Sequence, residues 1–111
     1  MKKILLSFLI LITLTACNKE ELTEYEKLMK ENEYIILDVR TPEEYNESHV
    51  KESINIPYDI ITEDVDLPKD KMIFIYCKSG RRSSIANDTL KSLGYKTYDM
   101  GAMSNLSLEI E

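Results

Sequence analysis

The nine residues from Tyr76 to Ser84 (YCKSGRRSS) combine one cysteine with three basic side chains. The apolar run 72–76 before them predicts a strand, and helical periodicity follows them. Cys77 is therefore expected in a tight loop between a strand and a helix, where the first N–H groups of the helix have no intrahelical partner. Such N–H groups, together with the helix dipole, bind anions and favour the thiolate form of a cysteine. The pattern predicts a nucleophilic cysteine.

The basic residues of this loop, Lys78, Arg81 and Arg82, all lie within five positions of Cys77. One helix dipole contributes about 0.3–1 kcal/mol, and one pKa unit corresponds to about 1.4 kcal/mol. The dipole alone should therefore lower the thiol pKa by less than one unit. We expect the three cations to supply the rest and to orient an anionic substrate. Gly80 is expected to adopt a positive φ in the tight turn.

The first sixteen residues predict an export signal that is removed. Lys2 and Lys3 precede the apolar run 4–14, which is shorter than the roughly 20 residues that span a bilayer. The tetrapeptide 14–17 (LTAC) resembles the lipobox of bacterial lipoproteins. That resemblance implies cleavage before Cys17 and diacylation of this cysteine, which anchors the chain in the cell membrane on its extracytoplasmic face. The alternative is an ordinary secretory signal followed by a chance cysteine.

The chain left after cleavage, residues 17–111, carries 12 basic and 20 acidic residues, a net charge of −8. Such a charge argues against binding to nucleic acid and against flat adsorption to an anionic bilayer, so we expect membrane attachment through acyl chains alone. With Cys17 acylated, Cys77 is the one free thiol, and no intramolecular disulfide can form. A lone thiol in an oxidising compartment suggests chemistry.

Strand and helix signals alternate along residues 22–103, which predicts an α/β domain with a mainly parallel sheet. Capping boxes at Thr23 and Thr41 indicate two helix starts, with Pro42 at the first position of the second helix. This second helix is expected to turn Tyr45 inward and to end near His49. The expected strands are 34–39, 54–57, 73–76 and 95–99, with a further helix in 58–67 and another from the cysteine loop to Gly94.

Four motifs follow one another along the chain: DVRTPEEY (38–45), HV (49–50) leading to SINIP (53–57), CKSGRRS (77–83) and LGY (93–95). In this order they resemble a single rhodanese domain. The resemblance covers roughly residues 22–103 and implies a three-layer domain whose central sheet is flanked by helices, with no cofactor. Residues 1–16 are then the signal peptide, 17–21 the lipidated cysteine and tether, and 22–111 the rhodanese-like domain. Ser48 replaces a glycine common in the family, and the chain contains no tryptophan.

The resemblance implies that Cys77 accepts a sulfane sulfur from a small anionic donor such as thiosulfate and holds it as a persulfide. The sulfur then passes to a thiol or to cyanide. Backbone N–H groups of residues 78–83 would surround the anions. Catalysis is assigned to Cys77 and Arg82, and substrate binding to Lys78, Ser79, Gly80, Arg81 and Ser83.

Three further polar residues, Asp38, Arg40 and His49, are expected to be structural and to lie near this site. A carboxylate at a strand end and a nearby arginine typically join loops through charge-assisted hydrogen bonds. His49 is the single histidine, and the alternative role for it is that of a general base. No partner ligand accompanies it in the sequence, so no metal site is expected.

Three other interpretations of the cysteine loop remain. Cysteine-dependent phosphatases and related arsenate reductases place arginine six positions after the cysteine, where this chain has Ser83, and Arg82 comes one residue earlier. A non-enzymatic module would use Cys77 to carry or sense sulfane sulfur, or would dock a partner protein. In the third interpretation, the loop is a structural connection around a buried, inert cysteine.

Overall fold

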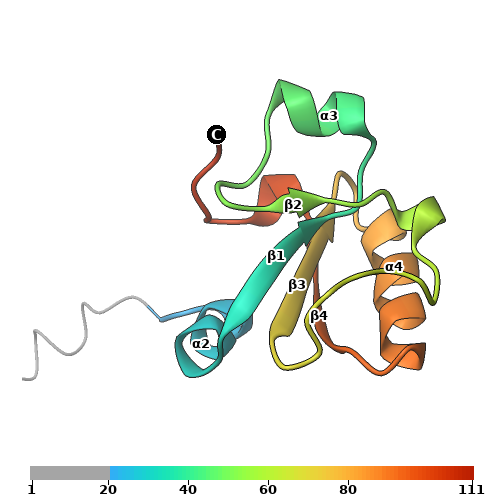
Figure 1. Ribbon diagram of the computed structural model, residues 1–111. Helices are drawn as coiled ribbons and strands as arrows, with labels where there is room; N and C mark the ends of the chain where they lie inside the picture. Colours follow the sequence, from blue (N-terminus) through green and yellow to red (C-terminus); the bar gives the residue numbers. More distant parts are fainter. Residues whose placement is uncertain (1–20) are drawn as a thin grey trace, which may run out of the picture.

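The computed structural model describes residues 21–111, which form a four-stranded sheet with helices on both faces (Figure 1). The predicted export signal, the lipobox and Cys17 lie outside the described residues. In the sheet the strands lie in the order β2-β1-β3-β4, and every neighbouring pair is parallel. The predicted α/β class is confirmed. The strands are β1 (Tyr34–Asp38), β2 (Ile54–Asn55), β3 (Met72–Cys77) and β4 (Lys96–Ala102).

Two of the three helices begin at the capping boxes expected from the sequence. The Thr23 side chain accepts from the Glu26 N–H, and the Thr41 side chain accepts from the Glu44 N–H, with each glutamate bonding back to the cap. Pro42 occupies the start of its helix, where no N–H is needed. The α-helices are α2 (Glu24–Glu31), α3 (Pro42–Glu47) and α4 (Arg81–Ser92), and the 3₁₀ turns are η1 (Tyr58–Ile60) and η2 (Met103–Asn105).

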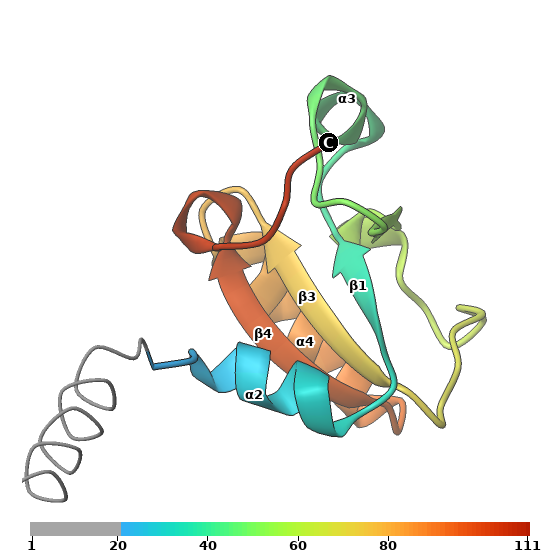
Figure 2. The same cartoon turned by 90° about the vertical axis from the view of Figure 1, so that its left-hand side faces the viewer.

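The sheet separates two hydrophobic clusters, because successive side chains of a strand point to opposite faces. Ile73, Ile75 and Cys77 of β3 belong to the cluster beneath α4, together with Leu90 of that helix. Tyr76 belongs to the cluster on the other face, which α2 and the C-terminal segment cover (Figure 2). The domain therefore has the three layers expected, and Cys77 lies on the α4 side of the sheet.

The prediction of a helix within residues 58–67 is wrong. Only the 3₁₀ turn η1 forms there, and the chain then continues without regular structure to β3. Ile61 and Leu67 are buried in the α4-side cluster at a spacing that no single helix face provides. The Asp64 N–H also bonds to the Thr62 hydroxyl at 3.3 Å, a local turn that competes with helical hydrogen bonding.

The last strand is longer than predicted, since β4 continues beyond Asp99 to Ala102. Ile75 pairs with Asp99, whereas Tyr76 pairs with Gly101, so a bulge interrupts the register. The Asp99 side chain accepts from the Gly101 N–H at 2.9 Å and holds the bulge. The bulge adds one residue to β4 opposite β3 and so interrupts the alternation of side chains at Asp99.

The predicted inward position of Tyr45 on α3 is only partly realised. The side chain is half-buried, its ring stacks on that of His49 at 3.8 Å, and its hydroxyl donates to the Ser53 carbonyl. The helix itself ends at Glu47, two residues before His49. Tyr45 therefore fastens α3 to the loop before β2 instead of entering a core cluster.

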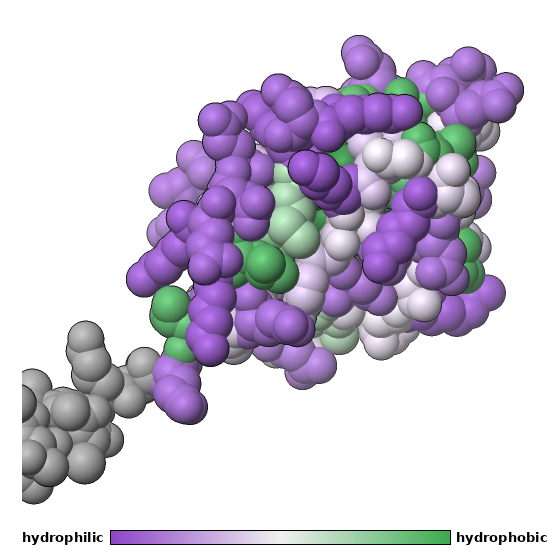
Figure 3. Space-filling model, turned by 90° about the horizontal axis from the view of Figure 1, so that it is seen from below, coloured by the Kyte–Doolittle hydropathy of each residue, from purple (hydrophilic) through white to green (hydrophobic). Residues whose placement is uncertain are grey.

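The surface at the end of the sheet that carries α2 is mostly hydrophilic, with hydrophobic side chains in small groups (Figure 3). Most residues of α2 other than Tyr25 are exposed or half-buried, including Glu24 and Glu31. Within residues 21–111, no helix is long and apolar enough to cross a membrane.

Tyr76 joins the core to a buried polar group at the ends of β1 and β3. Its hydroxyl donates to Asp38 Oδ2 at 2.6 Å and accepts from the Val50 N–H at 2.9 Å. Burial and the hydrogen bond to Asp38 together raise the pKa of Tyr76 to about 12. The hydroxyl therefore remains protonated and keeps donating to the carboxylate.

We expect Tyr76→Phe to lower the free energy of unfolding by about 1–3 kcal/mol, because it leaves a buried N–H and a carboxylate oxygen with fewer partners. Urea unfolding followed by circular dichroism measures the change. Tyr34→Phe is the matched control, since Tyr34 is exposed and its hydroxyl makes no hydrogen bond within residues 21–111. Equal effects of the two substitutions would contradict the role assigned to the Tyr76 hydroxyl.

Candidate active site

The loop from Cys77 to Arg81 connects the last residue of β3 to the first residue of α4. Gly80 is the N-cap of α4 and has φ +100°, ψ −14°, a conformation that L side chains rarely adopt. The predicted positive φ at Gly80 is confirmed. This conformation turns the Gly80 N–H toward Cys77 Sγ, to which it donates at 3.0 Å.

The Cys77 side chain has no exposed surface, yet its surroundings favour the thiolate. Burial raises the pKa of Cys77, but hydrogen bonding of the thiolate to the Ser83 side chain and to the N–H groups of Ser83, Gly80 and Ser79 outweighs burial, so the pKa lies below its ordinary value. In the structure the Gly80 N–H donates to the sulfur, and the Ser83 hydroxyl donates to the Gly80 carbonyl at 3.1 Å. An inert buried cysteine has a raised pKa, so these surroundings argue against the inert interpretation.

These hydrogen bonds, and not the neighbouring cations, dominate the lowering of the Cys77 pKa. Lys78 and Arg81 are exposed, and their side chains make no ion pair within residues 21–111. Arg82 does interact with Cys77 through charge, but its guanidinium is bound elsewhere. The expected main contribution of the three cations to this pKa is therefore wrong, because spacing in the sequence does not show which hydrogen-bond donors surround the sulfur.

Arg82 forms a two-point ion pair with Glu44 of α3. Arg82 Nη1 lies 2.7 Å from Glu44 Oε1 and Nη2 lies 3.1 Å from Oε2. The same carboxylate also accepts from the Thr41 N–H at 3.0 Å, as part of the capping box. Glu44 therefore holds the first turn of α3 against the first turn of α4, and the charge of Arg82 is fixed at the rim of the cysteine loop.

Asp38 and Arg40 form a buried ion pair beside the loop. Arg40 donates from Nε to both oxygens of Asp38 at 3.0 Å and from Nη2 to Oδ2 at 2.6 Å. Its Nη2 also donates to the Ser48 carbonyl at 2.7 Å, which fastens the end of α3. Burial opposes the charge of Arg40, but the hydrogen bond and charge of Asp38 prevail and raise its pKa.

His49 lies on the side of α3 that faces the C-terminal segment. Its Nδ1 is 2.8 Å from the Tyr45 carbonyl oxygen and its Nε2 is 3.4 Å from Glu111 Oε2. The His49 backbone also pairs with that of Glu111 in both directions, at 3.0 and 2.7 Å. The structure therefore gives His49 contacts that hold the C-terminal segment, and it does not bring the imidazole together with Cys77.

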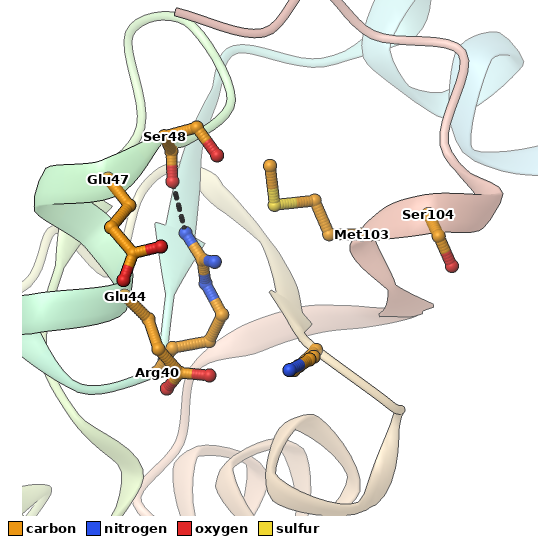
Figure 4. Close-up of a pocket in the computed structure, with 7 residues that line it drawn as sticks. Arg40, Glu44, Glu47, Ser48, Met103 and Ser104 are labelled. Carbon is orange, nitrogen blue, oxygen red and sulfur yellow. Dashed lines mark hydrogen bonds between the residues drawn. The ribbon is translucent and has the colours of Figure 1, made fainter.

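A cavity of about 430 Å³ opens beside the cysteine loop (Figure 4). The end of α3 forms one side, and η2 forms the opposite side. Five of its residues, Glu44, Glu47, Ser48, Met103 and Ser104, were not among the predicted site residues. No local signal in the sequence marks them as part of a site, because only folding brings α3 and η2 to the same loop. The cavity is lined by Arg40, Glu44, Glu47, Ser48, Lys78, Met103 and Ser104.

We expect Ser83→Ala to raise the pKa of Cys77, because it removes the side-chain hydrogen bond that does most to favour the thiolate. The ultraviolet absorbance of the thiolate, followed against pH in a Cys17→Ser chain, measures the pKa. Ser84→Ala is the control, since Ser84 is exposed and one position further along α4. An unchanged titration in Ser83→Ala would contradict the assigned cause.

The Glu44–Arg82 pair predicts a pH-dependent contribution to stability. The Arg82 hydrogen bond holds the pKa of Glu44 at about 2, below its ordinary value of 4.5. A folded-state pKa below the unfolded value stabilises the fold above the unfolded pKa, and this stabilisation disappears as the pH falls toward 2. Glu44→Gln should therefore cost about 1–3 kcal/mol at pH 7 and progressively less below pH about 4.

Urea unfolding of both chains across this pH range measures the difference. Glu43→Gln provides the control, because Glu43 is exposed on the same helix and its carboxylate makes no ion pair within residues 21–111. If the difference in free energy of unfolding between wild type and Glu44→Gln does not decrease in acid, the ion pair is not the source of that difference.

Comparison with known proteins gives the same description of the loop and the fold. Residues 21–104 match the rhodanese-like domain family, and residues 1–18 match the prokaryotic membrane lipoprotein lipid attachment site. The second match supports a lipid-anchored membrane localisation. Among solved structures, a rhodanese with anions from E. coli is 31% identical, with a TM-score of 0.60, over 70% of this chain and 96% of that one.

Curated relatives point to the same family. Thiosulfate sulfurtransferase PspE of Escherichia coli strain K12 is 37% identical over 62 residues, which are 53% of this chain and 60% of the relative. A sulfurtransferase of Allochromatium vinosum is 31% identical over 71 residues, 63% of this chain and 66% of the relative. The chain spans less than two thirds of the length of each of these two relatives. It spans 21% of the length of another relative. Fold, cysteine loop and family match agree in supporting a sulfurtransferase or sulfur-carrier role, and the chain belongs to the rhodanese-like domain family.

Proposed function

We propose that this protein is a rhodanese-type sulfurtransferase that carries sulfane sulfur as a persulfide on Cys77. The observation that carries the proposal is the Cys77 sulfur itself, which accepts from the Gly80 N–H at 3.0 Å and has a lowered pKa at the start of α4. A thiolate attacks sulfur, and the persulfide formed is again an anion. The same donors therefore stabilise the reactant and the intermediate.

In the first step, the Cys77 thiolate attacks the outer sulfur of a small anionic donor such as thiosulfate. A bond forms between Cys77 Sγ and that sulfur, the sulfur–sulfur bond of thiosulfate breaks, and its electron pair leaves with sulfite. In the second step, a thiolate or cyanide attacks the outer sulfur of the persulfide, and the Cys77 thiolate is restored. No cofactor takes part.

The loop residues have distinct roles in this proposal. Ser79, Gly80 and Ser83 hold the sulfur through the hydrogen bonds described above, while Lys78 and Arg81 are exposed and attract the anionic donor. Arg82 is a catalytic cation whose position Glu44 maintains. Because Cys77 has no exposed surface, the donor reaches it only after side chains at the mouth of the loop have moved.

The two competing activities have less support. In a phosphatase or arsenate reductase the loop would place arginine at position 83, but that position is occupied by Ser83, which is fully buried against the sulfur. A non-enzymatic carrier or sensor would form the same persulfide on Cys77 and would differ from the proposed enzyme only in lacking turnover. The experiment below separates these possibilities.

We also propose that Cys17 is lipidated and becomes the mature N-terminus after removal of residues 1–16. Residues 17–21 then form a short tether, and residues 22–111 form the domain. The lipid attachment match at residues 1–18 supports this arrangement. In this proposal the domain lies on the extracytoplasmic face of the cell membrane, where a soluble donor and acceptor reach it.

We expect thiosulfate to add one sulfur atom to Cys77 and cyanide to remove it. Mass spectrometry of the reduced full chain in detergent, before and after each reagent, measures both steps. Cys77→Ser should keep the fold but lose the added sulfur and all thiosulfate-to-cyanide turnover. Ser84→Ala should keep the added sulfur and the turnover. One stable persulfide without release would indicate a carrier, and turnover by Cys77→Ser would refute the assignment.

A further inference from the structure

The cavity beside the cysteine loop carries charged groups that no ion pair within residues 21–111 neutralises. The Glu44 carboxylate is occupied by Arg82. The carboxylate of Glu47 and the ammonium group of Lys78 make no ion pair or side-chain hydrogen bond within residues 21–111. The cavity wall thus carries one unpaired negative charge and one unpaired positive charge.

Arg40 adds a directed donor to the same cavity. Its side chain is only 7% exposed, and its Nε and Nη2 groups are bound to Asp38 and to the Ser48 carbonyl. Nη1 makes no hydrogen bond within the described part of the chain, and the residue lines the cavity. A buried guanidinium that keeps two N–H groups free toward a cavity favours a carboxylate ligand there.

We propose, on the basis of the function proposed above, that this cavity binds the sulfur acceptor and selects a small amino-acid thiol. The carboxylate of the acceptor binds Arg40 Nη1 and Lys78, and its ammonium group binds Glu47. Figure 4 shows Arg40 and Glu47 on one side of the cavity and Met103 on the other, where the thioether provides an apolar surface for the methylene carbon that bears the thiol.

The size and position of the cavity fit such an acceptor. A volume of about 430 Å³ is at the small end of the range for ligand sites. Lys78 lines the cavity and directly follows Cys77 in the chain. A persulfide extends the Cys77 side chain by one S–S bond, about 2 Å, and Lys78 borders the path between that outer sulfur and the acceptor.

The transfer balances without an added oxidant or reductant. The acceptor thiol loses its proton to solvent, and its thiolate attacks the outer sulfur of the Cys77 persulfide. A bond forms between these two sulfurs while the bond to Cys77 Sγ breaks, and its electron pair stays on Sγ as the thiolate. The product is the persulfide of the amino-acid thiol.

Four acceptors of similar size test the charge preference in the full chain in detergent with thiosulfate as donor. Cysteine carries both charges, cysteamine the ammonium, 3-mercaptopropionate the carboxylate, and 2-mercaptoethanol neither. After correction for the thiolate fraction of each thiol, we expect kcat/KM to be highest for cysteine and to fall about fivefold for each charge removed, the upper range for an accessible ion pair. Equal values for cysteine and 2-mercaptoethanol would overturn the proposal.

A charge-specific variant provides the second arm. Glu47→Gln should lower kcat/KM about fivefold for cysteine and cysteamine and leave the value for 3-mercaptopropionate within about twofold. Comparing each thiol with itself between chains cancels its intrinsic reactivity. Glu43→Gln, an exposed carboxylate on the same helix that does not line the cavity, should change none of the four values. An equal loss for all four thiols in Glu47→Gln would overturn the assigned contact.

Turnover with cyanide as acceptor distinguishes failure of the proposed acceptor site from failure of the sulfurtransferase function on which that site rests. Cyanide has no carboxylate or ammonium group, so its turnover does not depend on the acceptor contacts. Turnover with cyanide but no preference among the four thiols would overturn the acceptor site alone. Absence of both persulfide formation and cyanide turnover would overturn the sulfurtransferase function and this inference with it.

Discussion

The buried carboxylate of Asp38 joins the two central strands of the sheet at the end that carries the candidate site. It accepts from the Arg40 backbone and guanidinium and from the Tyr76 hydroxyl, and so links the end of β1 to β3. Arg40 extends the link to the end of α3, and Tyr76 extends it to Val50. Because removing one partner of a buried ion pair costs about 3–5 kcal/mol, these elements are held in one arrangement.

That arrangement determines where the chemistry takes place. The strand after Tyr76 has only one more residue, Cys77, which alternation turns to the α4 side. Tyr76 faces the polar network, and Cys77 faces the loop, so adjacent residues connect the scaffold to the candidate site. The Cys77 sulfur then accepts from the Gly80 N–H, whose direction follows from the left-handed conformation of Gly80. Preorganised donors of this kind stabilise an anion without rearrangement.

Glu44 shows how one side chain serves local and tertiary structure at once. Its Oε1 accepts from the Thr41 N–H and hydroxyl, which completes a capping box that the sequence pattern predicts. The same carboxylate binds Arg82, 38 positions along the chain. The capping interaction also restrains the glutamate rotamer, so the ion pair orders fewer side-chain torsions than a free surface pair would.

Local patterns in the sequence were sufficient for the elements whose signals involve near neighbours. The capping boxes at Thr23 and Thr41, the strands that lead to Asp38 and Cys77, and the positive φ at Gly80 follow from such signals, and the structure confirms them. By contrast, the helix expected in residues 58–67 does not form, because burial of Ile61 and Leu67 against the sheet outweighs local propensity.

Tertiary structure alone decided which side chains meet at the loop. The partner of Arg82, the cavity between α3 and η2, and the contacts of His49 with the C-terminal segment all join residues distant in the chain. Charge and spacing near Cys77 predicted a reactive cysteine, whereas the cause of its lowered pKa is the Ser83 hydroxyl and the loop N–H groups. Spacing along the chain reports the chemistry available at a site, but hydrogen bonds depend on direction, and direction is set only when strand, loop and helix pack together.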